Sequence, residues 1–258
     1  MGGAPALAQQ EAWHRWERTL TSARDYTQNG GNPYRDLVVR VTFTRESSSR
    51  RISGYGFWDG GRMFKVRTAL PPGTWHWRTA CVGSTGGQSC GQEDGTGRDK
   101  GLWRRGQFRI VPAKHGSAEI YRRGFLRVFN PGPGKHRYLT YGDGTPFYWL
   151  GDTAWQAPVS ANAAGWKAYL ENRRTKGFSV VQTAPATQYT GPITSFEQIG
   201  DCPSPAIPNA CSRWLPSYWQ NLDVVVEQAN RSGIVVVLAG LINPVGRGGG
   251  KSPQLYPA

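Results

Sequence analysis

Three polar or aromatic residues and a glycine follow one short apolar segment, and their types suit a sugar-binding site. The segment is Phe147-Tyr148-Trp149-Leu150, and Gly151, Asp152, Thr153 and Trp155 come directly after it. A sugar ring needs polar partners for its hydroxyl groups and an aromatic surface for its apolar face, which a carboxylate and an indole supply. The same residue types also occur at an ordinary strand end with a capping Asp. On residue types alone both interpretations stay open.

The surrounding segments predict strands that alternate with helices. Asp143-Gly144 predicts a type I′ hairpin turn, and the apolar run at 147–150 predicts a buried strand. Ser160 is expected to cap a helix that ends near Lys176, with Gly177 in the left-handed position after it. A strand over 178–183, a helix over about 215–233 and a strand over 234–241 complete the pattern.

This order predicts a parallel sheet with right-handed crossovers, which could begin a doubly wound sheet or a TIM barrel. No GxGxxG or P-loop follows any of the strands, which disfavours a nucleotide site. Polar residues at the carboxyl ends of such strands share one edge of the sheet. The predicted substrate-binding residues are therefore Asp152, Trp155, Gln182 and Asn243. Alternatively, the side-chain amides of Gln182 and Asn243 are buried and form hydrogen bonds with neighbouring backbone groups.

The N-terminal half has the pattern of an all-β domain. Alternating segments such as 37–44 and 63–69 are separated by turn signals at short intervals. We expect an antiparallel β-sandwich over 9–112 and a linker with one strand over 113–136. The fold class predicted for the whole chain is therefore β plus α/β, in two domains.

The charge of the chain is concentrated in this half. The net charge is +14, and residues 1–136 hold 22 Lys and Arg against 10 Asp and Glu. Such an excess suits nucleic acid or an acidic polymer such as a pectic polysaccharide. The arginines are scattered along strand-like segments, which is typical of a solvated basic face, and no nucleic-acid motif is present. We therefore expect no nucleic-acid partner and keep an acidic-polymer binder as a separate hypothesis.

The cysteines and the N-terminus predict a secreted or periplasmic protein. Four cysteines form two local pairs, Cys81 with Cys90 and Cys202 with Cys211, and two disulfides imply an oxidising compartment. Four free thiols in a cytosolic protein are the alternative. Residues 1–8 resemble the small-residue end of a signal peptide. No apolar run is long enough for a transmembrane helix, so no membrane partner is expected.

Several motifs resemble a known family. The first half is similar to the DUF5060-like sandwich that precedes certain glycoside hydrolases, and the second half is similar to the opening of the DUF4038, apiosidase-like hydrolases, which are (β/α)₈ barrels. The first resemblance rests on Asp59-Gly60, Lys65-Val66-Arg67, Pro72-Gly73-Thr74-Trp75 and Arg78-Thr79. The second rests on Arg137-Tyr138-Leu139, Asp143-Gly144-Thr145-Pro146-Phe147, Leu150-Gly151-Asp152-Thr153-Ala154-Trp155, Tyr169-Leu170 and Lys176-Gly177-Phe178.

The resemblance implies that residues 137–258 form an incomplete TIM barrel containing strands 1–3. In related barrels the acid/base and the nucleophile follow strands four and seven, so no catalytic residue is expected in this chain. Glycoside hydrolysis normally needs two carboxylates, and only Asp152 falls at a strand's carboxyl end. We expect the N-terminal part of a secreted glycoside hydrolase, inactive alone, that binds a polysaccharide or oligosaccharide. A non-catalytic carbohydrate-binding or adhesion protein is the alternative. No metal or cofactor is expected, and the oligomeric state stays open.

Overall fold

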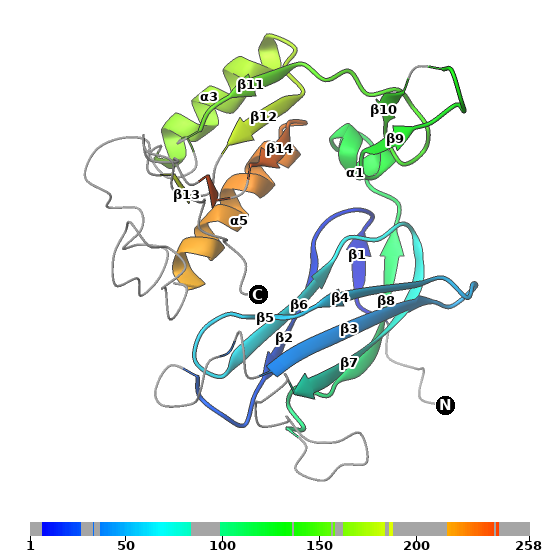
Figure 1. Ribbon diagram of the computed structural model, residues 1–258, viewed down its shortest axis with the longest axis vertical. Coiled ribbons are helices and arrows are strands. Elements are labelled where there is room, and N and C mark those ends of the chain that lie inside the picture. The colour runs from blue at the N-terminus through cyan, green and yellow to red at the C-terminus, as the bar shows by residue number, and fades with distance from the viewer. Residues whose placement is uncertain are drawn as a thin grey trace. The chain divides into compact units, whose positions relative to one another are not determined.

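The computed structural model divides the chain into two compact units, Met1–Ser117 and Ala118–Ala258 (Figure 1). It describes residues 7–26, 33, 37–83, 99–135, 137–155, 157, 162–183, 186–187, 216–239 and 241–242. The first unit is built of strands, and the helices described belong to the second unit. None of the described helices is long and apolar enough to cross a membrane.

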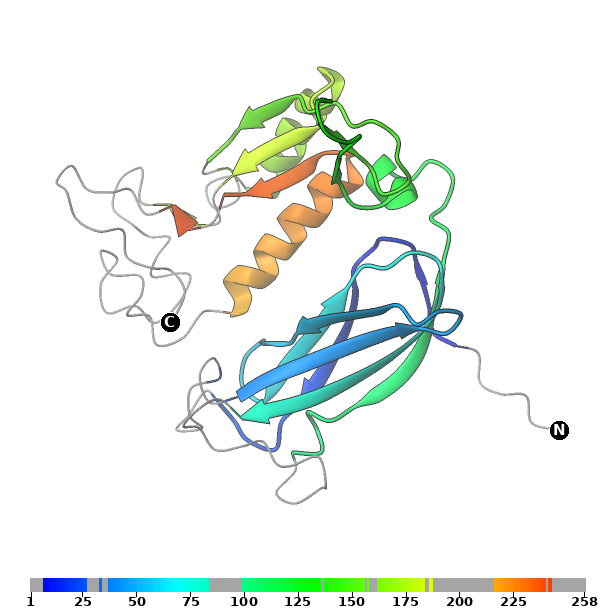
Figure 2. The same ribbon diagram turned by 45° about the vertical axis from the view of Figure 1, so that its right-hand side comes forward.

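Two sheets form the first unit. One has five strands in the order β1-β8-β7-β3-β4, and the other has three in the order β2-β6-β5 (Figure 2). β1 pairs with β8 in parallel and every other pairing in these sheets is antiparallel, so the expected antiparallel pattern fails at one edge. The strands are β1 (Gln9–Glu11), β2 (Trp16–Thr21), β3 (Leu37–Arg45), β4 (Arg51–Tyr55), β5 (Phe57–Trp58), β6 (Met63–Thr68), β7 (Gly73–Gly83) and β8 (Arg105–Val111).

One hydrophobic core joins the two sheets. Trp16 of β2 stacks on Phe108 of β8 with ring centroids 4.2 Å apart, and it meets Phe43 of β3 edge-on at 5.7 Å. Val41 and Trp75 are fully buried in the same cluster. Alternate residues along each strand face this core, as expected for two packed sheets.

Short strands and two long helices form the second unit. Ser117 ends the first unit, so the segment 113–136, expected to be a linker with one strand, contributes both a helix and a strand to the second. β9 and β10 pair antiparallel. The elements are α1 (Glu119–Arg123), β9 (Arg127–Phe129), β10 (Tyr138–Thr140), β11 (Gly151–Thr153), α3 (Ala163–Thr175), β12 (Val180–Thr183), β13 (Ala186–Thr187), α5 (Pro216–Arg231), β14 (Val235–Leu238) and β15 (Leu241–Ile242).

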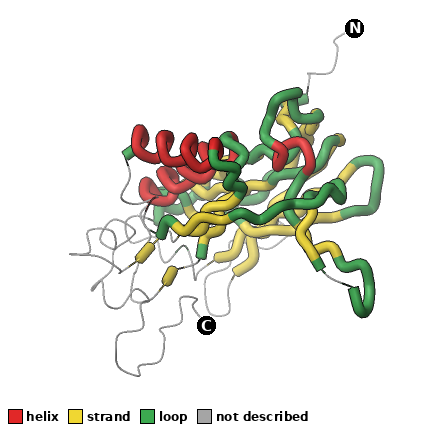
Figure 3. Tube along the Cα trace, turned by 90° about the horizontal axis from the view of Figure 1, so that it is seen from above, coloured by secondary structure: helices red, strands yellow, loops and turns green. Residues whose placement is uncertain are grey.

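β11, β12 and β14 form the parallel sheet that the sequence predicts, in that order. α3 and α5 pack together, and the Trp166 indole of α3 donates a hydrogen bond of 3.1 Å to the Val225 carbonyl of α5. Val181 of β12 is buried in the same apolar cluster, and Val236 of β14 packs against it. Both helices therefore cover one face of this sheet, as Figure 3 shows. A barrel that continues this sheet stays a prediction.

Two expected boundaries in this unit are wrong. The first parallel strand begins at Gly151 and not at Phe147, because the ladder to β12 starts with the pair Gly151 and Val180. Tyr148, inside the apolar run, is 77% exposed. The long helix begins after Asn162, whose side chain accepts a hydrogen bond from the Gly165 amide at 2.8 Å. The cap predicted at Ser160 lies outside the described residues.

The turn at Asp143-Gly144 also differs from the expected type. Gly144 has a φ of 94°, but Asp143 does not have positive φ, so this is not a type I′ turn. The Gly144 amide bonds to the Tyr141 carbonyl at 3.0 Å, and the Tyr141 amide bonds to the Thr145 carbonyl at 2.8 Å. This pattern is the three-residue hairpin loop with a glycine bulge. Asp143 stabilises it by accepting the Thr145 amide at 2.9 Å.

Candidate functional site

The parallel sheet has one face toward the helices and one face away from them. Side chains alternate along a strand, so residues paired in register share a face. Asp152 pairs with Val181, which pairs with Val236, and these positions lie on the face that α3 and α5 cover. Thr153 pairs with Gln182 and therefore lies on the opposite face. Two of the predicted ligands, Asp152 and Gln182, thus stand on different faces of the sheet.

The Asp152 carboxylate is bound by helix α3. Its Oδ2 atom accepts a hydrogen bond of 2.7 Å from the Tyr169 hydroxyl and lies 3.2 Å from Nη1 of Arg173. Its Oδ1 atom accepts the Thr153 amide at 2.8 Å. The Arg173 guanidinium also lies over the rings of Tyr169 and Phe178, at 5.2 and 5.3 Å from their centroids. The Asp152 side chain therefore ties β11 to α3.

Tyr169 is enclosed by the same contacts. Its ring stacks on Trp166 with centroids 5.5 Å apart and an interplanar angle of 17°. Burial, and then the hydrogen bond to Asp152, raise the pKa of Tyr169 far above its ordinary value. The hydroxyl therefore keeps its proton and acts as a hydrogen-bond donor to the carboxylate at physiological pH.

Trp155 lies just beyond the carboxyl end of β11 on a firmly held backbone. The Ala154 amide donates to the Gln182 carbonyl at 2.8 Å, which extends the ladder past the strand. The buried Thr183 hydroxyl donates to the Ala154 carbonyl at 2.8 Å and lies 3.3 Å from the Trp155 carbonyl. The Trp155 side chain is 36% exposed. An aromatic ring on a fixed backbone at a strand end is suited to stacking against a ligand.

Thr153 and Gln182 stand next to each other at the same end of the sheet as Trp155. Thr153 is exposed and Gln182 is half-buried, and their Cα atoms are partners in the ladder. A hydroxyl and an amide supply both donors and acceptors for sugar hydroxyl groups. Thr153, Trp155 and Gln182 are therefore the described groups that gather at the carboxyl end of the sheet away from the helices. Asn243, the fourth predicted ligand, lies outside the described residues.

The sequence patterns overlooked two features of this site. Strand alternation places Thr153 on the same side as Trp155, two residues away, but its register with Gln182 is known only from the structure. Arg173 is seven residues after Trp166, a spacing that places it on the same face of α3 as that buried residue. A cation on an apolar helix face predicts a carboxylate on the neighbouring element, and Asp152 is that partner.

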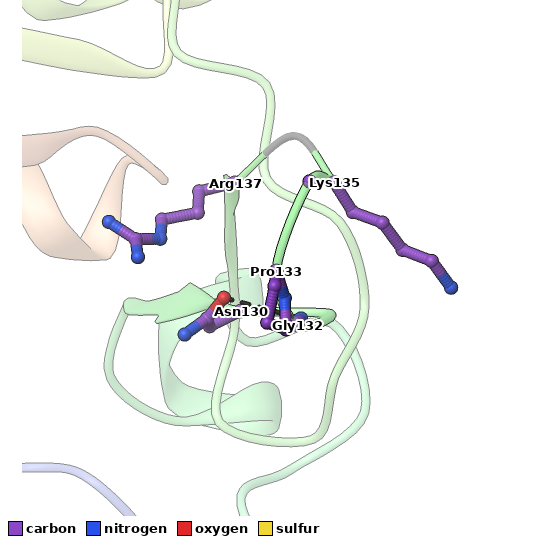
Figure 4. A pocket seen from close by; sticks show the side chains of 6 residues that line it. Asn130, Gly132, Pro133, Lys135 and Arg137 are labelled. Carbon is purple, nitrogen blue, oxygen red and sulfur yellow. Dashed lines mark hydrogen bonds between the residues drawn. The ribbon is translucent and has the colours of Figure 1, made fainter.

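A separate hollow of about 560 Å³ lies in the loop between β9 and β10 (Figure 4). Asn130, Gly132, Pro133, Lys135 and Arg137 line it. The Lys135 and Arg137 side chains extend in opposite directions, so their charges do not converge on one ligand. None of the predicted site residues lines this hollow.

The structure leaves the disulfide pairing open. Cys81 on β7 is buried and is not a free thiol. Cys90, Cys202 and Cys211 lie outside the described residues, so both proposed pairs stay predictions. No cluster of three or more His, Cys, Asp or Glu side chains within the described ranges could hold a metal ion.

Two family models match the chain. Residues 134–256 match the model described as the catalytic domain of apiosidase-like proteins. Residues 9–82 match DUF5060, a domain of unknown function. These are the two families that the motifs resemble, in the same order along the chain. No curated protein matches the chain.

Among solved structures, the chain is similar to a candidate glycoside hydrolase from Bacteroides vulgatus ATCC 8482. The two are 20% identical with a TM-score of 0.64, over 90% of this chain and 41% of that one. This likeness concerns the fold, and the chain spans well under half of that protein's length. A glycoside hydrolase of family 5 from the same organism is 24% identical over 46% of this chain and 25% of that one. Its TM-score is 0.33, too low to support a conclusion.

The order of the matches agrees with the two units of the structure. The DUF5060 match falls within the strand-built unit, and the other match falls within the unit that holds the parallel sheet. The chain thus contains a segment that matches the DUF5060 model, followed by a segment that matches the model of the apiosidase-like catalytic domain, and its fold is similar to that of a candidate glycoside hydrolase.

Proposed function

We propose that this chain is part of a secreted glycoside hydrolase and that it binds a sugar side chain of a plant or microbial polysaccharide. The match of residues 134–256 to the apiosidase-like catalytic domain carries the proposal. The name of that family makes an apiosyl group the first ligand to test. The arrangement at the sheet edge supports it, because an exposed tryptophan follows the strand end at which a hydroxyl and an amide are paired in register.

In this proposal Trp155 stacks on the apolar face of the sugar ring. Thr153 and Gln182 bond to its hydroxyl groups, and they stand on the face of the sheet that the helices leave uncovered. Asp152, first considered as a sugar ligand, has its Oδ2 atom engaged by Tyr169 and Arg173. We assign Asp152 the role of holding β11 on α3, which positions Trp155 three residues further on.

We also propose that residues 1–258 bind the sugar without hydrolysing it. Hydrolysis needs a pair of carboxylates on either side of the scissile bond. Among the described residues, Asp152 is the one carboxylate at the carboxyl end of a strand in the parallel sheet, and it contacts α3. Asp143 and Glu227 are ion-paired elsewhere, with Arg123 and Arg231.

The test is titration of the 258-residue chain with methyl apioside and other methyl glycosides, followed by calorimetry. We expect saturable binding that Trp155→Ala weakens by about 2- to 12-fold, because aromatic contacts contribute roughly 0.5–1.5 kcal/mol. Trp149→Ala is the matched control, since Trp149 is 46% exposed and precedes the same strand. Equal losses in both variants, or no binding to any glycoside, would contradict the proposed site.

The proposed lack of hydrolysis is tested separately with nitrophenyl glycosides. We expect the chain to release nitrophenol no faster than buffer alone. Release that a carboxylate substitution abolishes would show that the chain contains its own catalytic pair. Binding by residues 7–117 in place of the second unit would instead favour the carbohydrate-binding or adhesion alternative.

A further inference from the structure

The outer face of the five-stranded sheet carries a cluster of arginines. Val39, Val41 and Phe43 of β3 face the core, so alternation places Arg40 on the outer face. In the same way Trp75 and Phe108 face the core, and their strands present cations outward. Five exposed arginines form this basic face, namely Arg40, Arg51, Arg78, Arg105 and Arg109.

The strand register brings these side chains together. Arg78 of β7 pairs directly with Arg105 of β8. Arg40 of β3 is the partner of Ala80, two residues along β7 from Arg78, so Arg40 and Arg78 are diagonal neighbours. Residues directly across a ladder are about 5 Å apart and diagonal neighbours are about 7–8 Å apart. Long arginine side chains at these spacings can contact one ligand together.

Ion pairs among the described residues leave the arginines of the basic face without a carboxylate partner. Within the described part of the chain none of the five forms an ion pair with a carboxylate. The three-stranded sheet differs, because Lys65 contacts Asp59 at 2.7 Å and Glu17 at 3.2 Å, and Arg67 contacts Glu17 at 2.8 Å. Two acids border the basic face and contact other cations: Glu46 lies 3.8 Å from His76 Nε2, and Glu11 of β1 lies 3.0 Å from Lys114 Nζ.

This arrangement costs stability in the free protein. Like charges directly opposite each other on neighbouring strands are destabilising, and Arg78 and Arg105 have this relation. Folding alone does not explain why such a pair is unneutralised. A polyanion on this face would turn the repulsion into a set of charge-assisted hydrogen bonds.

The surface between the arginines suits a sugar chain. A hollow of about 490 Å³ lies here, lined among others by Thr42, His76, Arg78, Arg105 and Gln107. Hydroxyl and amide groups therefore alternate with guanidinium groups along its walls. Tyr55, the register partner of Arg40, is 67% exposed and offers an aromatic surface. Carboxylates at intervals along a hydroxyl-rich chain would match this pattern of groups.

We propose that the basic face of the first unit binds an acidic polysaccharide through the uronate carboxylates of its sugars. Charge complementarity carries the proposal, since planar guanidinium groups bind carboxylates in bidentate fashion. The choice of a polysaccharide over a nucleic acid rests on the proposed function. The basic face would hold the polymer, independently of the sugar site on the second unit.

The experiment measures binding of the 258-residue chain to polygalacturonate, to a neutral galactan and to duplex DNA in about 0.1 M salt, where the Debye length is about 10 Å. We expect polygalacturonate to bind tightest and its affinity to fall steeply as salt is added. Arg78→Gln/Arg105→Gln should weaken this binding about 2- to 30-fold, as expected for the loss of two exposed ion pairs. Its melting temperature should not fall, because the substitution removes a repulsion.

The matched control is Lys167→Gln/Arg174→Gln, which removes the same charge from exposed positions on α3. It should bind polygalacturonate like the wild type. Equal weakening in both variants, equal binding to the neutral galactan, or tighter binding to DNA would each overturn the proposal. Methyl glycoside binding is measured on the same proteins. If the wild-type chain binds polygalacturonate but no methyl glycoside, the result counts against the proposed sugar site and not against the basic face.

Discussion

Replacing Asp152 tests whether this carboxylate holds the fold or binds the sugar. In Asp152→Ala, Tyr169 loses a charged acceptor at 2.7 Å and Arg173 loses its ion-pair partner at 3.2 Å. A hydrogen bond to a charged group contributes roughly 1.5–3 kcal/mol and an exposed ion pair roughly 0.2–1 kcal/mol. The Asp152 and Arg173 side chains are 28% and 26% exposed, so solvent screens their interaction in part. We therefore use the lower half of the summed range. We expect a loss of about 2–3 kcal/mol in the free energy of unfolding of the second unit.

The assay is urea unfolding followed by the helical circular dichroism signal, because the described helices all lie in the second unit. With a slope of about 2 kcal/mol per molar urea, the midpoint should fall by about 1 M. Asp152→Asn should lose about 1–2 kcal/mol, since a neutral acceptor remains for Tyr169. Glu171→Ala on the exposed side of α3 is the control and should change stability by no more than about 0.5 kcal/mol.

The refuting result is specific. If Asp152→Asn unfolds at the wild-type urea concentration and yet loses methyl glycoside binding, the carboxylate is a sugar ligand and not a structural anchor. If it loses stability and still binds the sugar when folded, the role assigned to it here is supported. Folded protein in each binding assay is ensured by working well below the urea midpoint of the variant.

Two further predictions concern stability. In the first unit, Gly101→Ala should cost at least about 1–3 kcal/mol, because its Cβ would meet the Thr21 carbonyl oxygen at 1.6 Å. Gly54→Ala, whose nearest contact is 3.8 Å away, should melt like the wild type in calorimetry, and equal effects would contradict the packing argument. In the second unit, the raised pKa of Tyr169 stabilises the folded state below pH 10 and that stability is lost as the pH rises above it. Urea midpoints measured against pH should therefore fall less steeply above about pH 10 in Tyr169→Phe than in the wild type. The exposed control Tyr138→Phe should follow the wild type. A Tyr169→Phe curve identical to that of the wild type would refute the assigned pKa direction.

Sequence patterns predicted most of the elements. Alternation over 37–44 corresponds to β3, and Gly177, with a φ of 80°, follows the first long helix as expected. The parallel pairing of β1 with β8 was not predictable, because a three-residue strand carries no signal of its partner or direction. The strand expected at 147–150 failed for a related reason. Apolar residues indicate burial, whereas a strand is defined by its register with a neighbouring strand. The register with β12 begins at Gly151.

The sequence by itself determined which chemical groups gather at the sheet edge, because a run of strands and helices places the residues after each strand together. It did not determine which of them face outward. Neighbouring residues on a strand point to opposite faces, so Asp152 and Thr153 had to divide between the two. Only the tertiary structure decided the division, because packing of the neighbouring valines against α3 and α5 commits Asp152 to the helices and leaves Thr153 beside Gln182 on the other face.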